Sequence, residues 1–322
     1  MTTAHFFLPV EYRMEFKVKV AIIGTGFVGA SAGYAMVLRN SCRELVLIDT
    51  NRAKAEAEAS DIQHATPLSH AVRVYAGTYG DIKGAKVVII TAGTNQRSGE
   101  TRLDLIGRNV EVFNVIVPNI VSAEPNAIIL VATNPVDILT TVTERLAGVP
   151  HGQVIGSGTT LDTARFRTLV AEHVGVDSHH VHGYVVGEHG DSEVVVWSSA
   201  TVAGMPIKNF CMARNIDWND DIRLNITENI RTAAYKIIQG KGATYYGIGA
   251  VLAHITERIV RNHRAILTVS ATIDQYNVAL SLPRLVGGNG IISEIGLSMN
   301  EEEKILLQSS ADVLVNALST LL

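Results

Sequence analysis

Continuous runs of apolar residues, rather than alternating ones, mark the first half of the chain. Four such runs, at residues 18–23, 45–48, 87–92 and 127–132, stop at glycine, aspartate or a Thr-Asn-Pro turn. Continuous runs of this kind are typical of strands that are buried on both faces of a parallel sheet. A shorter run at residues 72–75 predicts one more strand.

Between these runs, apolar residues recur at helical intervals. The pattern predicts helices over residues 53–63, 103–121 and 136–146, with Gly148 ending the third and Pro118 ending or kinking the second. Strands that alternate with helices as far as about residue 156 indicate a doubly wound α/β domain of the Rossmann type. Ligands of such domains bind beyond the carboxyl ends of the strands.

The pattern changes in the second half, where the chain looks α+β. A helix from residue 161 to 174 ends at Gly175, and a final helix begins near Asn300. The other predicted elements are strands at 181–186, 194–197, 265–273 and 285–287 and helices at 221–239 and 246–262. We therefore divide the chain into an N-terminal arm (1–16), a Rossmann domain (17–156) and an α+β substrate domain (157–322).

Composition narrows the possible environments and partners. The 322 residues are 47% hydrophobic with a formal net charge of −4, and no block of like charges suggests a nucleic-acid partner. No apolar segment approaches the length of a membrane helix, and the first residues do not read as a secretory signal. Cys42 and Cys211 lack metal-ligand or redox spacing, as expected of reduced thiols in a cytoplasmic protein.

The first apolar run ends at a turn with glycines at positions 24, 26 and 29, and a helical pattern follows. In a dinucleotide site, the first glycine permits the tight turn and the second lets a pyrophosphate approach the backbone. The third lets the helix pack closely on the strand. The pyrophosphate would face the helix N-terminus, which favours an anion.

Asp49 ends the second apolar run, about twenty residues after the last of these glycines, where a carboxylate would hold the adenosine ribose. An acid at this position disfavours a 2′-phosphate and therefore predicts NAD rather than NADP. The alternative is that Asp49 only caps a turn with Thr50 and Asn51.

One histidine stands out among the eleven by its position. His189 lies in a polar, glycine-flanked loop, residues 187–192, between two apolar runs. An imidazole can both give and take a proton near neutral pH. It needs a carboxylate to orient it, and spacing alone leaves several acids in competition for that role.

Five motifs together resemble the lactate/malate dehydrogenase family. They are GTGFVG at residues 24–29, QRSGETRLDL at 96–105, TNPVD at 133–137, LDTARFR at 161–167 and GEHGDS at 187–192. The resemblance extends from about Val18 to the C-terminus.

The resemblance implies the catalytic roles. His189 would be the acid/base, and Asp162 would orient its imidazole ring. Arg165 would bind the substrate carboxylate through two hydrogen bonds. Arg102 would polarise the reacting carbonyl when the loop of residues 95–105 closes over the substrate. Taken alone, Asp162 reads as a helix N-cap and Arg165 as half of a surface ion pair.

The resemblance also implies the binding residues. Substrate contacts would come from Gln96, Arg102, Asn134, Arg165 and Thr244. Without the resemblance, Asn134 would be interpreted as a turn residue before Pro135, and nothing in the sequence would mark Thr244 as a functional residue. The expected cofactor-binding residues are Gly24, Gly26, Phe27, Val28, Gly29, Asp49, Gly93, Thr94, Thr133 and Asn134.

The implied activity is reversible NADH-dependent reduction of pyruvate to L-lactate in a homotetramer, with no metal. Arg167 and His182 match the positions where bacterial relatives bind fructose 1,6-bisphosphate; an exposed arginine and a strand histidine are the alternative. Malate, or a broader range of 2-hydroxy acids, is the nearest rival substrate class. A non-catalytic NAD-binding protein is disfavoured, because it has no use for Arg102, Asp162, Arg165 and His189 together.

Overall fold

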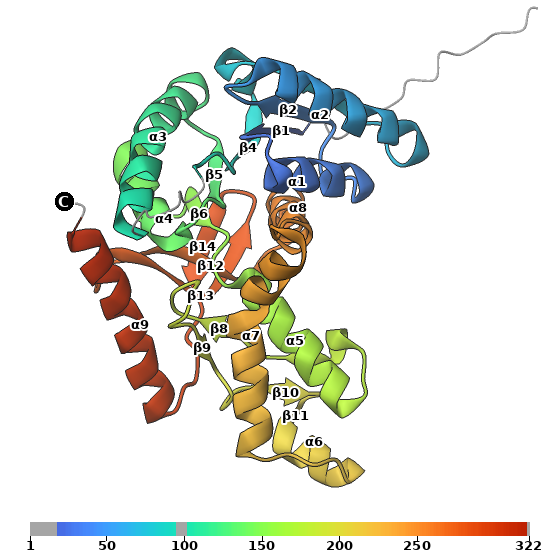
Figure 1. Cartoon of the computed structure of the whole chain (residues 1–322), viewed down its shortest axis with the longest axis vertical. Coiled ribbons are helices and arrows are strands. Elements are labelled where there is room, and N and C mark those ends of the chain that lie inside the picture. The colour runs from blue at the N-terminus through green and yellow to red at the C-terminus, as the bar shows by residue number, and fades with distance from the viewer. Residues whose placement is uncertain (1–17, 95–101, 321–322) are drawn as a thin grey trace, which may run out of the picture.

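A computed structural model describes residues 18–94 and 102–320, except for the side chains of residues 102 and 103 (Figure 1). The predicted N-terminal arm, Gln96 and the loop that precedes Arg102 lie outside the described residues.

The predicted parallel sheet is present. Its strands lie side by side in the order β3-β2-β1-β4-β5-β6, and every neighbouring pair is parallel. Their bounds are β1 Lys19–Ile23, β2 Glu44–Ile48, β3 Arg73–Ala76, β4 Ala85–Ile90, β5 Ile128–Val131 and β6 Val154–Gly156. Buried β-branched residues on both sides of these strands explain the continuous apolar runs.

Helices cover both faces of the sheet, as a doubly wound fold requires. One core packs the sheet against α1 (Phe27–Leu38), α2 (Arg52–Ala65) and α8 (Tyr246–Val260). The opposite core packs it against α3 (Arg102–Ala123) and α4 (Val136–Ala147).

The second half of the chain extends this sheet. Strand β6 pairs with β12 (Ala265–Ile273), and the antiparallel strands β13 (Val278–Gly287) and β14 (Gly290–Glu294) follow at the sheet's edge. The sheet thus crosses the division that we place after residue 156, and that division stays a prediction.

Most of the remaining strands and helices lie in the lower part of the molecule in Figure 1, and α9 (Glu301–Ser319) runs along its left side. The strands are β7 Val181–His182, β8 Val185–Val186, β9 Val194–Val195, β10 Thr201–Val202 and β11 Met205–Pro206. The helices are α5 Thr160–Val174, α6 Ile207–Arg214, α7 Asp220–Lys241 and α9 Glu301–Ser319. Short 3₁₀ turns occur at Thr66–Leu68, Tyr79–Ile82 and Ser178–His180.

Two details of the predicted elements differ in the structure. Helix α3 continues through Pro118 and so does not end there, because Phe113, Val117 and Ile120 are fully buried and their packing holds the helix together. The predicted strand at 181–186 is split at Gly183 into β7 and β8, which join different sheets.

Helix α6 was not predicted from the sequence, and β13 is longer than the strand predicted at 285–287. Gly148 and Gly175 end their helices in left-handed conformations, as predicted. In the described part of the chain, no helix has both the length and the apolar character needed to cross a membrane. Cys42 and Cys211 are both buried and free.

Candidate active site

The glycine-rich turn joins β1 to α1 at the carboxyl edge of the sheet. Gly24 has a φ of 97°, and a Cβ atom there would collide with the backbone of Ala92. A Cβ atom on Gly29 would collide with the carbonyl oxygen of Gly24, whereas one on Gly26 would meet nothing within 4 Å. Gly24 and Gly29 thus permit the turn and the close helix, and Gly26 leaves open backbone at the N-cap of α1.

Asp49 lies beside this turn at the end of β2. Its Oδ2 accepts hydrogen bonds from the backbone N–H of Thr25 (2.7 Å) and the Thr25 hydroxyl (3.0 Å), and Oδ1 accepts from the N–H of Asn51 (2.9 Å). Partial burial tends to raise the pKa of Asp49, but these hydrogen bonds outweigh it and keep the pKa below its usual value. The carboxylate therefore caps a turn and also faces the glycine-rich loop.

The turns after β4 and β5 are tied together by a residue that the sequence analysis missed. Asn109 of α3 is buried; its Oδ1 accepts from the N–H of Thr94 (2.8 Å), and its Nδ2 donates to the carbonyl of Asn134 (3.1 Å). Asn109 occurs at helical spacing from Ile106 and Phe113, where an apolar residue is expected. A polar residue on the apolar face of the predicted helix was the signal in the sequence that could have indicated a role for Asn109.

The backbone of the His189 loop is fixed from two sides. The N–H of Glu188 donates to Oγ of Ser310 (2.8 Å), and the N–H of His189 donates to Oδ2 of Asp137 (2.8 Å). Ser270 donates to the other Asp137 oxygen, and burial raises the pKa of Asp137 to about 6. Asp137 received no role from the sequence, although it is the last residue of the TNPVD motif, and that position was the available signal.

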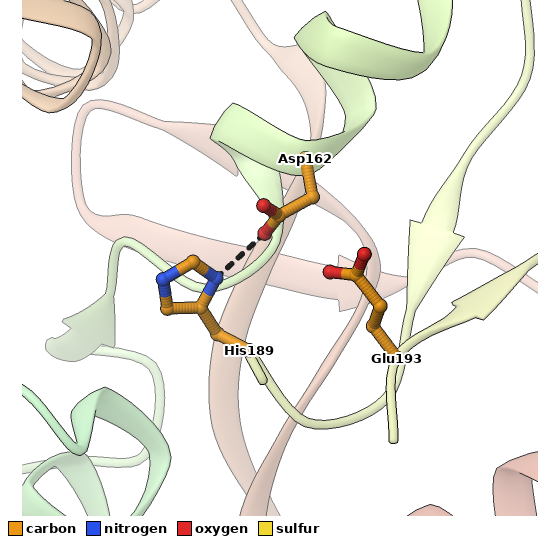
Figure 2. Close-up of side chains that lie close together, drawn as sticks. All are labelled: Asp162, His189 and Glu193. Atoms are coloured by element: carbon orange, nitrogen blue, oxygen red, sulfur yellow. Dashed lines mark hydrogen bonds and ion pairs between the residues drawn. The ribbon is translucent and has the colours of Figure 1, made fainter. Parts of the chain in front are cut away.

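Asp162 lies between His189 and Arg165, the two other described side chains to which the resemblance gives catalytic or substrate-binding roles. Its Oδ2 lies 2.6 Å from Nδ1 of His189, and its Oδ1 accepts a hydrogen bond from Nη1 of Arg165 at 2.7 Å. Thr159 is the N-cap of α5, so the capping alternative for Asp162 is wrong. Figure 2 shows the His189 ring with Nδ1 toward Asp162 and Nε2 directed away from it.

The charges of this arrangement favour a protonated imidazole. Burial lowers the pKa of His189, but the attraction and hydrogen bond of Asp162 prevail and raise that pKa to about 9. The pKa of Asp162 is lowered: burial opposes this shift, and His189 and Arg165 outweigh burial. At neutral pH the site therefore holds an imidazolium that can give up a proton.

A third carboxyl group, that of Glu193, lies close to this pair (Figure 2). Ligand atoms of Asp162, His189 and Glu193 all lie within 4.8 Å of one another, a spacing that can hold a metal ion. Both Asp162 oxygens already have partners, and the Arg165 guanidinium would repel a cation. This cluster is better suited to holding protons than a metal.

Thr244 lies in the segment between α7 and α8, next to Tyr245. The Tyr245 ring stacks on that of Phe27 with centroids 5.2 Å apart, which places this segment over the start of α1. Arg102 is the first residue of α3, and its side chain is outside the described part. Of the predicted effector residues, Arg167 is half-buried on α5 and His182 is exposed on β7.

Two family models match almost the whole chain. The NAD binding domain of lactate/malate dehydrogenase matches residues 18–156, and the alpha/beta C-terminal domain of lactate/malate dehydrogenase matches residues 159–322.

Individual relatives agree with these models. An L-lactate dehydrogenase of Chloroherpeton thalassium is 61% identical over 303 residues, which are 94% of this chain and 99% of that protein. One from Deinococcus radiodurans is 54% identical over 92% of this chain and 97% of its own length. A lactate dehydrogenase from a deep-sea metagenome superposes with a TM-score of 0.92 at 42% identity, covering 95% of this chain and 99% of the other.

Proposed function

The chain belongs to the lactate/malate dehydrogenase family, and we propose that it is an L-lactate dehydrogenase, which interconverts pyruvate and L-lactate with NAD. Two relatives that are more than half identical to the chain are named L-lactate dehydrogenase. Their names support pyruvate, rather than another 2-oxo acid, as the substrate of this chain. The observation that carries the chemistry is the position of Asp162 between His189 and Arg165.

The glycine-rich turn fits NAD, which in this family exchanges a hydride with C2 of the substrate. The open backbone at Gly26 and the N-terminus of α1 suit a pyrophosphate, and Asp49 is an acceptor at the edge where a ribose would lie. Phe27, Val28 and Gly29 follow at the start of α1. Gly93, Thr94, Thr133 and Asn134 at the ends of β4 and β5 would line the rest of the cofactor crevice.

For pyruvate reduction, His189 would donate the proton on Nε2 to the carbonyl oxygen. Asp162 fixes the ring by its bond to Nδ1 and stabilises the imidazolium before transfer. Arg165 would pair with the substrate carboxylate, and Arg102 would stabilise the charge that develops on the reacting oxygen. Asn134, Thr244 and Gln96 would complete the substrate pocket.

The same proposal includes the oligomeric state of the protein, its location in the cell and its effector. We expect a cytoplasmic homotetramer, in agreement with two free thiols. We also expect a sugar bisphosphate such as fructose 1,6-bisphosphate to bind near Arg167 and His182. Arg167 is a half-buried cation on α5, and its guanidinium could pair with a phosphate through its remaining N–H groups.

A substrate panel tests the proposed function. NADH absorbance is followed with pyruvate, with oxaloacetate and with no oxo acid. We expect rapid loss with pyruvate and little with oxaloacetate. Faster loss with oxaloacetate would indicate a malate dehydrogenase, and no loss with any oxo acid would indicate a non-catalytic NAD-binding protein.

A further inference from the structure

Glu193 is a buried acid in the candidate active site to which no role has been assigned. It lies directly before β9, and its backbone N–H donates to the carbonyl of Gly190 at 3.2 Å. The residue is only 2% exposed, and its carboxyl group lies within 4.8 Å of the ligand atoms of Asp162 and His189. A side chain this deeply buried so near the reacting groups affects their charge balance.

Among the described side chains, no cationic group forms a hydrogen bond or ion pair with this carboxyl group. Oε1 of Glu193 is buried and, within residues 18–94 and 102–320, has no hydrogen-bond partner. The nearest arginine of α7, Arg231, donates from Nη2 to the backbone carbonyl of Glu193 at 2.9 Å rather than to its side chain. Asp162, in contrast, has both oxygens paired.

The groups that act on Glu193 come from three elements. They are Asp162 and Arg165 on α5, His189 in the loop, and Arg231 on α7. Burial raises the pKa of the Glu193 carboxyl to about 8, and repulsion from Asp162 adds to this, against the attraction of the three cationic groups. At neutral pH Glu193 is therefore mostly protonated and uncharged.

This protonation matters for an anionic substrate. The substrate carboxylate would bind Arg165, whose Nη1 already donates to Asp162. An ionised Glu193 would place a further buried negative charge beside Asp162 and the substrate carboxylate, with its Oε1 lacking a hydrogen-bond partner among the described residues. Such a charge is strongly unfavourable.

We propose that Glu193 is a positioning residue whose carboxyl group must carry a proton for the substrate carboxylate to bind beside Arg165. This inference rests on the proposed function, because it takes the substrate to be a monocarboxylate that binds Arg165. Productive binding of pyruvate then requires two protons, one on His189 and one on Glu193. A group that only supported the fold would not change this number.

The number of protons is read from the alkaline limb of the pH profile of kcat/KM for pyruvate. Two required protons lower kcat/KM by about a hundredfold per pH unit at the alkaline limit, and one proton lowers it by about tenfold. We expect the steeper limb for the wild type and the shallower one for Glu193→Gln, an uncharged side chain of the same shape. Glu193→Met provides a second uncharged variant if the glutamine variant folds poorly.

The matched control is Asp191→Asn, which removes an acid two residues away that is exposed and accepts a hydrogen bond from Tyr235 at 2.9 Å. This variant should keep the steep limb. A steep limb in Glu193→Gln, or a shallow limb in the wild type, would overturn the inference.

An infrared difference spectrum between about pH 7 and about pH 10 tests the protonation without any turnover. The wild type should lose a C=O band of a protonated carboxylic acid that Glu193→Gln lacks. Asp137 is already mostly ionised at pH 7, so it contributes little to this difference. The same band in Glu193→Gln would refute the inference, whereas the expected band in a wild type that is inactive on pyruvate would refute only the proposed function.

Discussion

The Oδ2 atom of Asp162 lies 2.6 Å from Nδ1 of His189, although the two residues stand on different elements of the fold. Asp162 belongs to the first turn of α5, and His189 to the loop between β8 and β9. Both are largely withdrawn from water, with the Asp162 side chain 2% and the His189 side chain 25% exposed. Their attraction is therefore weakly screened, and Asp162 makes the largest contribution that raises the pKa of His189, with Asp137 and Glu193 adding to it.

Replacing this carboxylate should move the pH dependence of pyruvate reduction. In the wild type, loss of the His189 proton should lower kcat/KM as pH rises through the His189 pKa of about 9, in addition to the loss at lower pH that we assign to Glu193. In Asp162→Asn the attraction is gone while the burial remains, so the loss should move to lower pH by about two units or more. A pH profile of kcat/KM measures this shift, and an unmoved alkaline limb would contradict the assigned pairing.

The glycine-rich turn offers a matched pair of substitutions. Gly26→Ala puts a methyl group into open space, so the free energy of unfolding should stay near that of the wild type. NADH binding should nevertheless weaken by about tenfold or more, about 1.4 kcal/mol, because the methyl group blocks approach to the backbone.

Gly29→Ala should behave differently, because its methyl group would meet the carbonyl oxygen of Gly24. We expect the free energy of unfolding to fall by about 1–3 kcal/mol. Denaturant titration and NADH fluorescence measure the two effects. Equal behaviour of the two variants would contradict the roles given to these glycines.

Much of this architecture could be predicted from the sequence. The parallel strands and the Gly24 turn were recognised because continuous apolar runs and glycine spacing report local requirements of the backbone. Pro118 and Gly183 misled the prediction because tertiary packing decided the outcome. Helix α3 is held by its buried face, and a side chain at Gly183 would press on the ring of Phe166.

The site was predicted less completely, and the reason is physical. His189 was found by its loop, but no spacing rule links it to Asp162, and the family resemblance supplied that pairing. Asp137, Asn109 and Glu193 were missed because their role lies in burial and in contacts far along the chain. A sequence shows an acid or an amide without showing whether it is buried.

Gln96 is predicted from the sequence to make the enzyme selective for monocarboxylates. Pyruvate has one carboxylate, for Arg165, whereas the second carboxylate of oxaloacetate would be desolvated against a neutral amide. Gln96→Arg should therefore raise kcat/KM for oxaloacetate and lower it for pyruvate, and shift the preference by at least about a hundredfold. Ratios of kcat/KM for the two oxo acids test this, and an unchanged ratio would assign selectivity to another residue, with Arg97 the first candidate.

The effector prediction concerns Arg167 and His182. Fructose 1,6-bisphosphate should lower the pyruvate concentration at half-saturation, because a phosphate that binds one assembly better shifts the population toward it. Arg167→Gln should remove the response while keeping basal activity. Saturation curves with and without the sugar phosphate, from about pH 5 to about pH 8, measure it. Superimposable curves for the wild type would show that fructose 1,6-bisphosphate does not act at Arg167 and His182.

Pyruvate reduction by His189→Asn, measured together with NADH binding, tests whether His189 is the proton donor. The cofactor contacts are assigned to the Rossmann domain, so NADH affinity should stay within a few-fold of the wild type. Loss of the proton donor should lower kcat/KM for pyruvate by about 10²–10⁴-fold. Turnover near the wild-type rate, or loss of NADH binding, would contradict the assignment of His189 as the group that gives its proton to pyruvate.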